Sequence, residues 1–197
     1  LMDAANPIAD TPINFGKKVM VVGGGNTAMD SCRTAKRLGA DVTLVYRRSE
    51  AEMPARLEEV KHAKEEGINF LTLHNPKEYK ADENGRVCAC VLDVMELGEP
   101  DASGRRSPQT TGRTITMECD QVIVAVGVSP NPLVPNSIEG LELGRKNTIA
   151  VNDQMQSSRQ EIYAGGDIVR GGATVILAMG DGRRAAANMA EHLLSTN

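Results

Sequence analysis

Three consecutive glycines after a short apolar run are the first residues in this sequence that could do chemistry. Residues 23–28 read GGGNTA and match G-x-G-x-x-G/A, the pattern that holds a dinucleotide pyrophosphate between a strand and a helix. Gly23 would permit the tight turn, Gly25 would let the backbone approach the phosphates, and the small Ala28 would let helix and strand pack closely. Free N–H groups at the start of the helix would attract the same anion.

The residues around this pattern strengthen it. Gly24 completes the corner, and the side chains of Asn26 and Thr27 could add hydrogen bonds to the phosphates. An apolar run precedes the corner, a helical pattern follows it, and a second apolar run comes about twenty residues later. We therefore predict a dinucleotide site. The alternative is a glycine turn in another kind of α/β domain.

Two arginines stand at the end of the second predicted strand, where the type of dinucleotide is usually selected. An Asp or Glu there would bind the ribose hydroxyls of NAD or FAD, but this chain has Arg47 and Arg48. Guanidinium groups bind a 2′-phosphate through charge-assisted hydrogen bonds, whereas a carboxylate would repel it. The pair favours NADP. The alternative is two solvated surface arginines.

Hydropathy patterns predict the elements that would position these groups. Continuous apolar runs predict buried strands of a parallel sheet at residues 17–22, 41–46, 68–73 and 121–127. One helical pattern runs from Asn26 to Leu38. A second ends at Gly67; Ser49 and Glu52 fit a capping box at its start, although Pro54 suggests that the helix begins a little later. The other expected elements are an antiparallel meander at 76–119 with a mobile polar loop at 98–112, a short strand at 161–167, and a long helix within 171–194.

Composition excludes several classes of protein. The 197 residues, 41% hydrophobic and 24% charged, are typical of a soluble chain of one or two domains. A net charge of -4, with no Trp, two Phe and three Tyr, argues against nucleic-acid binding. No apolar run is long enough for a membrane span, and the first residues are not a signal peptide. The four cysteines and three histidines form no metal-like cluster, so we expect no metal site and a reducing, cytoplasmic protein.

Four segments in order closely resemble one family. They read VVGGGNTAMD, VTLVYRRSEAEMPA, VIVAVGVSPNP and IYAGGDIVRGGATVILAMGDGRRAA, and together they cover nearly the whole chain. They resemble the small-subunit family of NADPH-dependent glutamate synthase, which includes related subunits of ferredoxin–NADP oxidoreductases and sulfide dehydrogenases. The resemblance implies an NADP domain inserted into an FAD domain. Hydride would pass from NADPH to FAD, and electrons would leave through iron–sulfur clusters to a partner subunit.

The resemblance also implies roles for particular residues. The glycine corner and the two arginines would hold NADP, and the strand-end Gly127 would lie near the nucleotide. In the second flavin motif, Asp167 would bind the ribityl chain of FAD. Ala173 and Thr174 would start the last helix, whose N-terminus would face the flavin. Because the cofactors carry the chemistry, no catalytic side chain is predicted.

The fold predicted from these observations is α/β with three parts. Residues 1–16 would form a linker or arm, and residues 17–132 a Rossmann-like three-layer NADP-binding domain with a parallel sheet and an antiparallel meander. Residues 133–197 would form the C-terminal portion of an FAD-binding domain. The family's earlier G-x-G-x-x-G and iron–sulfur cysteines do not occur here, so we expect a fragment that is inactive alone.

Two further hypotheses concern partners and function. Exposed apolar residues at 175–177 could support a homodimer of the fragment. The alternative function is a stand-alone module that binds or senses NADP(H) without redox turnover. A short-chain reductase is disfavoured, because none of the three tyrosines is followed by Lys at the Tyr-x-x-x-Lys spacing.

Overall fold

The computed structural model describes residues 15–100, 104 and 106–195. The chain divides into two compact units, Leu1–Gly127 and Val128–Asn197. Most of the arm predicted at 1–16 lies outside the described residues. The cofactors assigned to 17–132 and 133–197 stay predictions.

A four-stranded parallel sheet forms the centre of the first unit. Its strand order is β3-β2-β1-β7, with β1 (Lys18–Val22), β2 (Asp41–Tyr46), β3 (Asn69–Thr72) and β7 (Gln121–Val124). β1 pairs in parallel with β2 on one side and with β7 on the other. The predicted parallel sheet is thus confirmed, and each run of apolar residues corresponds to one of its strands.

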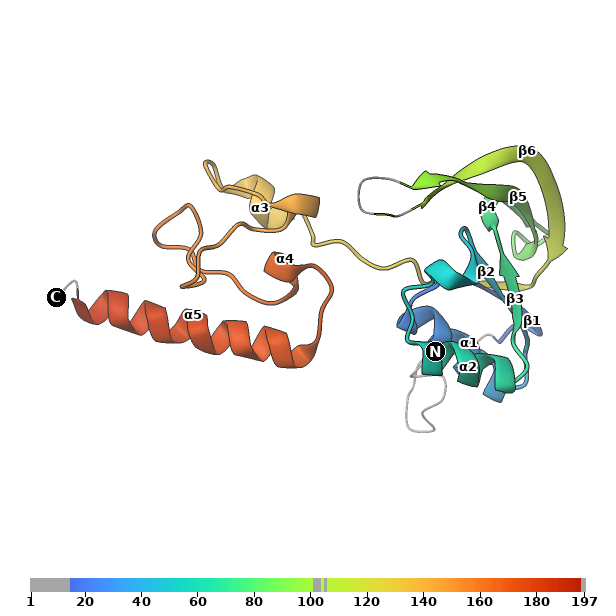
Figure 1. The fold of residues 1–197 in the computed structure, drawn as a ribbon, viewed down its shortest axis with the longest axis horizontal. Helices are drawn as coiled ribbons and strands as arrows, with labels where there is room; N and C mark the ends of the chain where they lie inside the picture. The colour runs from blue at the N-terminus through green and yellow to red at the C-terminus, as the bar shows by residue number, and fades with distance from the viewer. Residues whose placement is uncertain (1–14, 101–103, 105, 196–197) are drawn as a thin grey trace. The chain divides into compact units, whose positions relative to one another are not determined.

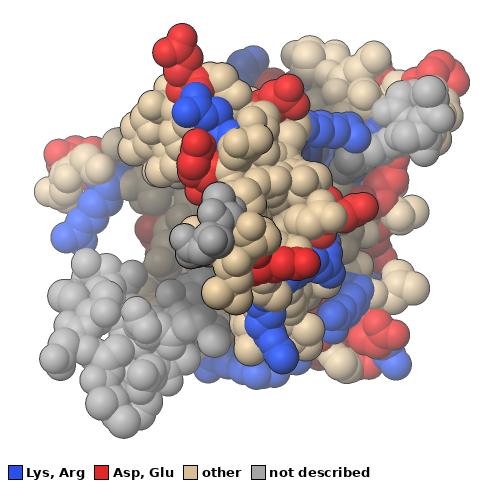
Figure 2. All heavy atoms as spheres, turned by 90° about the vertical axis from the view of Figure 1, so that its left-hand side faces the viewer, with Lys and Arg blue, Asp and Glu red and all other residues tan. Residues whose placement is uncertain are grey.

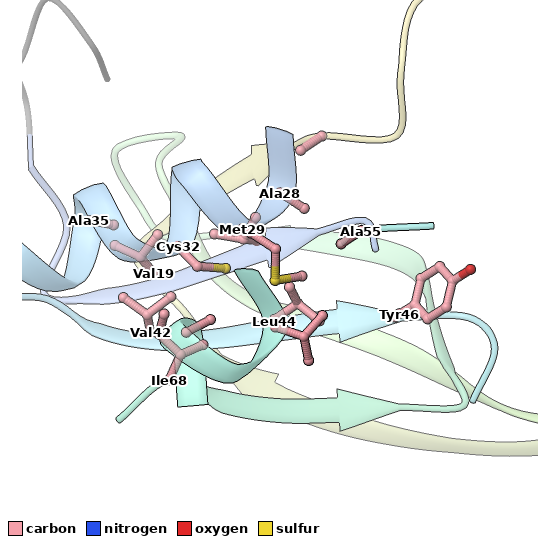
Figure 3. Packing of buried hydrophobic residues seen from close by; sticks show 14 of the residues in the cluster. Val19, Ala28, Met29, Cys32, Ala35, Val42, Leu44, Tyr46, Ala55 and Ile68 are labelled. Carbon is pink, nitrogen blue, oxygen red and sulfur yellow. The ribbon is translucent and has the colours of Figure 1, made fainter. Parts of the chain in front are cut away.

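The first hydrophobic core lies between this sheet and two helices, α1 (Asn26–Arg37) and α2 (Leu57–Glu65). Val19 and Val21 of β1 point into it, because alternate residues of a strand face the same side. Figure 3 shows Met29 and Cys32 of α1 pointing toward the strands. Both of these side chains are fully buried, which fixes the start of α1 against the end of β1.

The second core lies on the opposite face of the same sheet. Met20 and Val22 of β1 pack there against an antiparallel sheet of order β4-β5-β6. Its strands are β4 (His74–Ala81), β5 (Val87–Pro100) and β6 (Arg106–Glu118). Figure 1 shows the helices and the antiparallel sheet on opposite sides of the parallel strands. The three-layer arrangement with a meander is therefore confirmed.

The mobile loop predicted at 98–112 is wrong for most of its length. β5 continues to Pro100 and β6 begins at Arg106, while residues 101–103 and 105 lie outside the described part. Leu97 pairs with Pro108 across this ribbon. The side chains of the ribbon are mostly exposed, so strand formation there needs no alternation of apolar residues. Polar composition alone therefore does not distinguish this exposed ribbon from a loop.

The segment after β2 begins with a short turn. Ser49 and Glu52 form the predicted capping box, but it encloses only the 3-10 turn η1 (Glu50–Glu52). The helix α2 begins at Leu57, beyond Pro54, as the proline suggested. Residues 49–56 consequently form a bent segment that lies next to the glycine corner, where it makes the hydrogen bonds described below.

The second unit consists of short elements and one long helix. These are α3 (Leu133–Ser137), η2 (Arg145–Asn147), α4 (Asp167–Arg170) and α5 (Val175–Ser195). The strand predicted at 161–167 is wrong, because Tyr163 makes only an isolated bridge with Gln156. The predicted long helix is present as α5. None of the helices in the described part of the chain combines the length and apolar character that a membrane span requires.

Candidate functional site

The glycine corner follows directly after β1, and two of its glycines are required by close packing. Gly23 has a φ of +140°, and a Cβ there would lie 2.3 Å from the carbonyl oxygen of Ala125. A Cβ on Gly24 would lie 2.6 Å from the ring of Tyr46. Gly25 differs, because a Cβ there would meet nothing within 4 Å. The corner therefore leaves open space beside Gly25, as a site that receives a ligand must.

The start of α1 offers hydrogen-bond donors at the same place. Gly25 is the N-cap residue; it supplies no side-chain cap, and the first turn carries no acidic residue. The carbonyl oxygen of Gly25 accepts from the N–H groups of Ala28 and Met29. Within the described residues, the N–H groups of Asn26 and Thr27 have no partner. These donors and the positive end of the helix dipole suit an anion.

A cleft of ≈ 540 Å³ opens at the carboxyl ends of β1, β2 and β7. This end of a parallel sheet is the usual position of nucleotide sites in α/β proteins. Seven of the predicted residues line the cleft: Gly23, Gly24, Gly25, Thr27, Arg47, Arg48 and Gly127. The structure thus brings the glycine corner, the arginine pair and the strand-end glycine to one cavity.

The two arginines lie in different environments. Arg47 is exposed, whereas Arg48 is only 7% exposed, and its Nε is buried with no hydrogen-bond partner in the described chain. The backbone of Arg48 is held by a hydrogen bond from the N–H of Leu73 to its carbonyl oxygen, at 3.1 Å. Leaving a buried charged donor unpaired costs about 1–3 kcal/mol or more. Arg47 and Arg48 both line the cleft, so the residues present fit a phosphate bound there through their guanidinium groups.

Asn26 lies beside the cleft but does not line it. Its Oδ1 accepts a hydrogen bond from the N–H of Arg56 at 2.9 Å. Two further bonds attach the same segment, from the N–H of Ala55 to the carbonyl oxygen of Gly24 and from the Tyr46 hydroxyl to the carbonyl oxygen of Glu52. Asn26 therefore positions residues 49–56 against the corner. Its predicted contact with phosphate stays a prediction.

Seven further residues line the cleft that the sequence did not single out, among them Tyr46, Pro54 and Asn75. Tyr46 is buried under Gly24, so it shapes the floor of the corner. A signal for Asn75 was available, because it is a polar residue just beyond the third parallel strand, at the same edge as the arginines.

The second unit brings together the three residues assigned to the flavin. Asp167 Oδ1 accepts a hydrogen bond from the N–H of Ala173 at 3.2 Å. Thr174 Oγ1 accepts from the N–H of Leu177 at 3.4 Å, as a residue that caps a helix does. A Cβ on Gly172 would meet nothing within 4 Å. Asp167, Ala173 and Thr174 are all exposed at the start of α5. Their predicted contacts with FAD stay predictions.

A buried ion pair holds this loop against α5. Asp181 is 1% exposed and accepts from Arg170 Nε at 2.6 Å and from Arg170 Nη2 at 2.7 Å. Its Oδ2 also accepts from the N–H of Gly166 at 3.1 Å. The hydrogen bonds from Arg170 and Gly166 lower the pKa of Asp181 to about 2. The ion pair therefore positions the loop that carries Asp167.

Charges and possible metal ligands elsewhere form no comparable site. Figure 2 shows basic and acidic side chains interspersed over the described part of one face. Among the described residues, no three His, Cys, Asp or Glu side chains come together as metal ligands. The cleft in the first unit is therefore the candidate nucleotide site.

Comparison with known proteins agrees with this geometry. A family model described as pyridine nucleotide-disulphide oxidoreductase matches residues 2–182. The NADP(+)-dependent formate dehydrogenase subunit beta of Moorella thermoacetica is 43% identical over 90% of this chain. The glutamate synthase [NADPH] small chain of Escherichia coli (strain K12) is 41% identical over 87% of it. These matches confirm the resemblance drawn from the four segments.

Solved structures show the same fold. The thioredoxin reductase of T. acidophilum superposes with a TM-score of 0.74 over 90% of this chain, at 22% identity. The chain spans 53% of that protein, 25% of the formate dehydrogenase subunit and 38% of the glutamate synthase small chain. It therefore corresponds to one part of each of these longer proteins.

Proposed function

The chain belongs to the pyridine nucleotide-disulphide oxidoreductase family, and from that premise we propose that it is the NADPH-binding portion of a flavin-dependent oxidoreductase. The observation that carries the proposal is the cleft, in which a glycine corner and the two arginines that follow β2 line one cavity. A dinucleotide with a 2′-phosphate matches both, because it carries two anionic groups one ribose apart.

Each part of the cleft has a task in binding. The open space at Gly25 and the free N–H groups of Asn26 and Thr27 would receive the pyrophosphate. Arg48 would donate to the 2′-phosphate from a preformed, buried position, and Arg47 would add a second guanidinium from the exposed side. Bound NADPH supplies a hydride, so these residues orient the ligand and none needs to act as an acid or base.

The second unit would contribute residues to the binding site of the flavin that accepts this hydride. Asp167 would bind the ribityl chain of FAD, and the start of α5 at Ala173 and Thr174 would face its electron-rich edge. We further propose that electrons pass on to iron–sulfur clusters and a partner subunit, and that the parent activity is of the glutamate synthase (NADPH) type. The support for this finer assignment is the 41% identity to a glutamate synthase small chain.

The test is a calorimetric titration of the chain with NADPH and, separately, with NADH. We expect NADPH to bind at least tenfold more tightly, because one charge-assisted hydrogen bond contributes about 1.5–3 kcal/mol. Arg48→Ala should abolish most of this preference and Arg47→Ala only part of it. The matched control is Arg113→Ala, an exposed position on β6.

Three outcomes would count against the proposal. Equal affinity for NADPH and NADH would refute the binding of the 2′-phosphate by the two arginines, but not the binding of the pyrophosphate at the glycine corner. Binding of neither would remove the nucleotide site altogether. Bound FAD with redox turnover in this chain alone would contradict the proposal that it is only the NADPH-binding portion of the enzyme.

A further inference from the structure

Asn75 is placed at the cleft by an unusual turn. Leu73 follows β3 with a φ of +55°, in the left-handed region that leucine rarely adopts. This turn takes the chain out of the parallel sheet and into the antiparallel strand β4. The N–H of Leu73 donates to Arg48 and its carbonyl oxygen accepts from Met95, so both sides of the turn are fixed. Asn75 then lines the same cleft as Arg48.

The amide of Asn75 is oriented by one hydrogen bond and has its oxygen and one N–H left for a ligand. Its Nδ2 donates to the carbonyl oxygen of Pro76 at 3.1 Å. No residue in the described part of the chain donates to its Oδ1, and the side chain is half-buried. An amide held in this way offers a ligand the acceptor Oδ1 and one remaining N–H, and the bond to Pro76 fixes which of the two faces each way.

The order of the strands indicates which part of the ligand reaches Asn75. Moving from the end of β1 to the end of β2 and on past the end of β3, the cleft presents first the glycine corner, then the arginines, then Asn75 near the start of β4. Neighbouring strands lie about 4.8 Å apart. In NADPH the pyrophosphate, the 2′-phosphorylated ribose and the adenine follow one another in that same order. The base therefore falls at the third position, beyond the arginines.

We propose that Asn75 recognises the adenine ring by accepting a hydrogen bond from its exocyclic amino group. The inference rests on the proposed function, because it assumes that a dinucleotide lies along the cleft from Gly25 to Arg48. It adds a specificity for the base, which neither the glycine corner nor the arginines can supply. Both of those groups contact phosphates, which are the same whatever base the nucleotide carries.

The probe is the NADPH analogue in which hypoxanthine replaces adenine, so that a carbonyl oxygen stands where the amino group was. Calorimetric titration of the unaltered chain should give NADPH about a tenfold advantage, because the analogue sets two acceptors against each other. Asn75→Ala should bind both ligands with similar affinity and still prefer NADPH to NADH. The matched control is Asn69→Ala, an exposed residue at the opposite end of β3, which should keep the tenfold discrimination.

The outcomes separate this inference from the proposed function. Equal affinity of the unaltered chain for NADPH and the analogue would overturn the role of Asn75 while leaving the preference over NADH intact. A preference for NADPH over the analogue that persists in Asn75→Ala would also overturn the role of Asn75. Failure to bind either ligand would remove the proposed function together with this inference. If Asn75→Ala does not fold, Asn75→Ser serves as the second variant, and the comparison on the unaltered chain needs no substitution.

Discussion

Replacing Gly25 with alanine should separate binding from folding. The backbone of Gly25, with φ −92° and ψ 177°, is accessible to alanine, and the added Cβ would meet nothing within 4 Å. Alanine at a helix N-cap is worse than glycine by about 0.5–1 kcal/mol. A less flexible unfolded chain offsets about 0.4–1 kcal/mol of this. The free energy of unfolding should therefore change by less than about 0.5 kcal/mol.

The effect on binding should be much larger. The new methyl group would occupy the space into which the pyrophosphate must come to reach the N–H groups of Asn26 and Thr27. Losing one or two charge-assisted hydrogen bonds, at about 1.5–3 kcal/mol each, weakens binding by at least about tenfold. Titration with NADPH measures this, and urea unfolding of the same preparation measures stability.

The comparison variant is Gly24→Ala, one residue earlier. Its Cβ would lie 2.6 Å from the buried ring of Tyr46, so we expect a loss of about 1–3 kcal/mol in unfolding free energy. Unchanged NADPH affinity in Gly25→Ala would refute the placement of the pyrophosphate at the corner. A loss of stability in Gly25→Ala as large as that in Gly24→Ala would refute the inference that the space beside Gly25 is open.

Three other predictions concern stability and thiol reactivity. The folded pKa of Asp181 is about 2, below its usual 3.8, so its contribution to stability is complete above about pH 4 and is lost as the pH falls toward 2. Asp181→Asn should flatten acid unfolding over that interval, as followed by circular dichroism. Arg33→Ala should lower the unfolding free energy by about 1 kcal/mol, because Arg33 pairs with Glu66 at 2.9 Å between α1 and α2; a loss unaffected by salt would contradict an ionic origin. In the folded protein a colorimetric thiol reagent should react only with Cys88, which is exposed, whereas burial raises the pKa of Cys32 to about 12; rapid reaction of a second thiol would show that the cores open.

Much of the first unit could be predicted because its signals are local. A parallel strand buried on both faces is a continuous apolar run, and the turn from β1 into α1 needs glycines. The arginine pair was recognised by its place after β2, since strand ends meet at one edge. That these residues line one cleft follows directly from this topology.

Other features depend on contacts that no local pattern reveals. The position of Asn75 depends on the left-handed turn at Leu73, a conformation for which a leucine gives no sign. The engagement of Asn26 by Arg56 depends on a segment thirty residues away. Asp181 lies within the predicted long helix, and nothing in the sequence marks it as the buried anchor of the loop before α5. The environment of each of these three residues depends on which distant elements of the chain meet in the fold.

The unpaired nitrogen of Arg48 has a consequence for how long the protein survives. That group is unsatisfied within the described chain, so the native state is less stable than its packing alone would make it. A ligand bound in the cleft would add stability by mass action, about 1.4 kcal/mol for each tenfold rise in its concentration above its dissociation constant. Chains that carry NADPH would unfold less often and be degraded more slowly. The concentration of reduced nucleotide in the cell would then help to set the abundance of the protein.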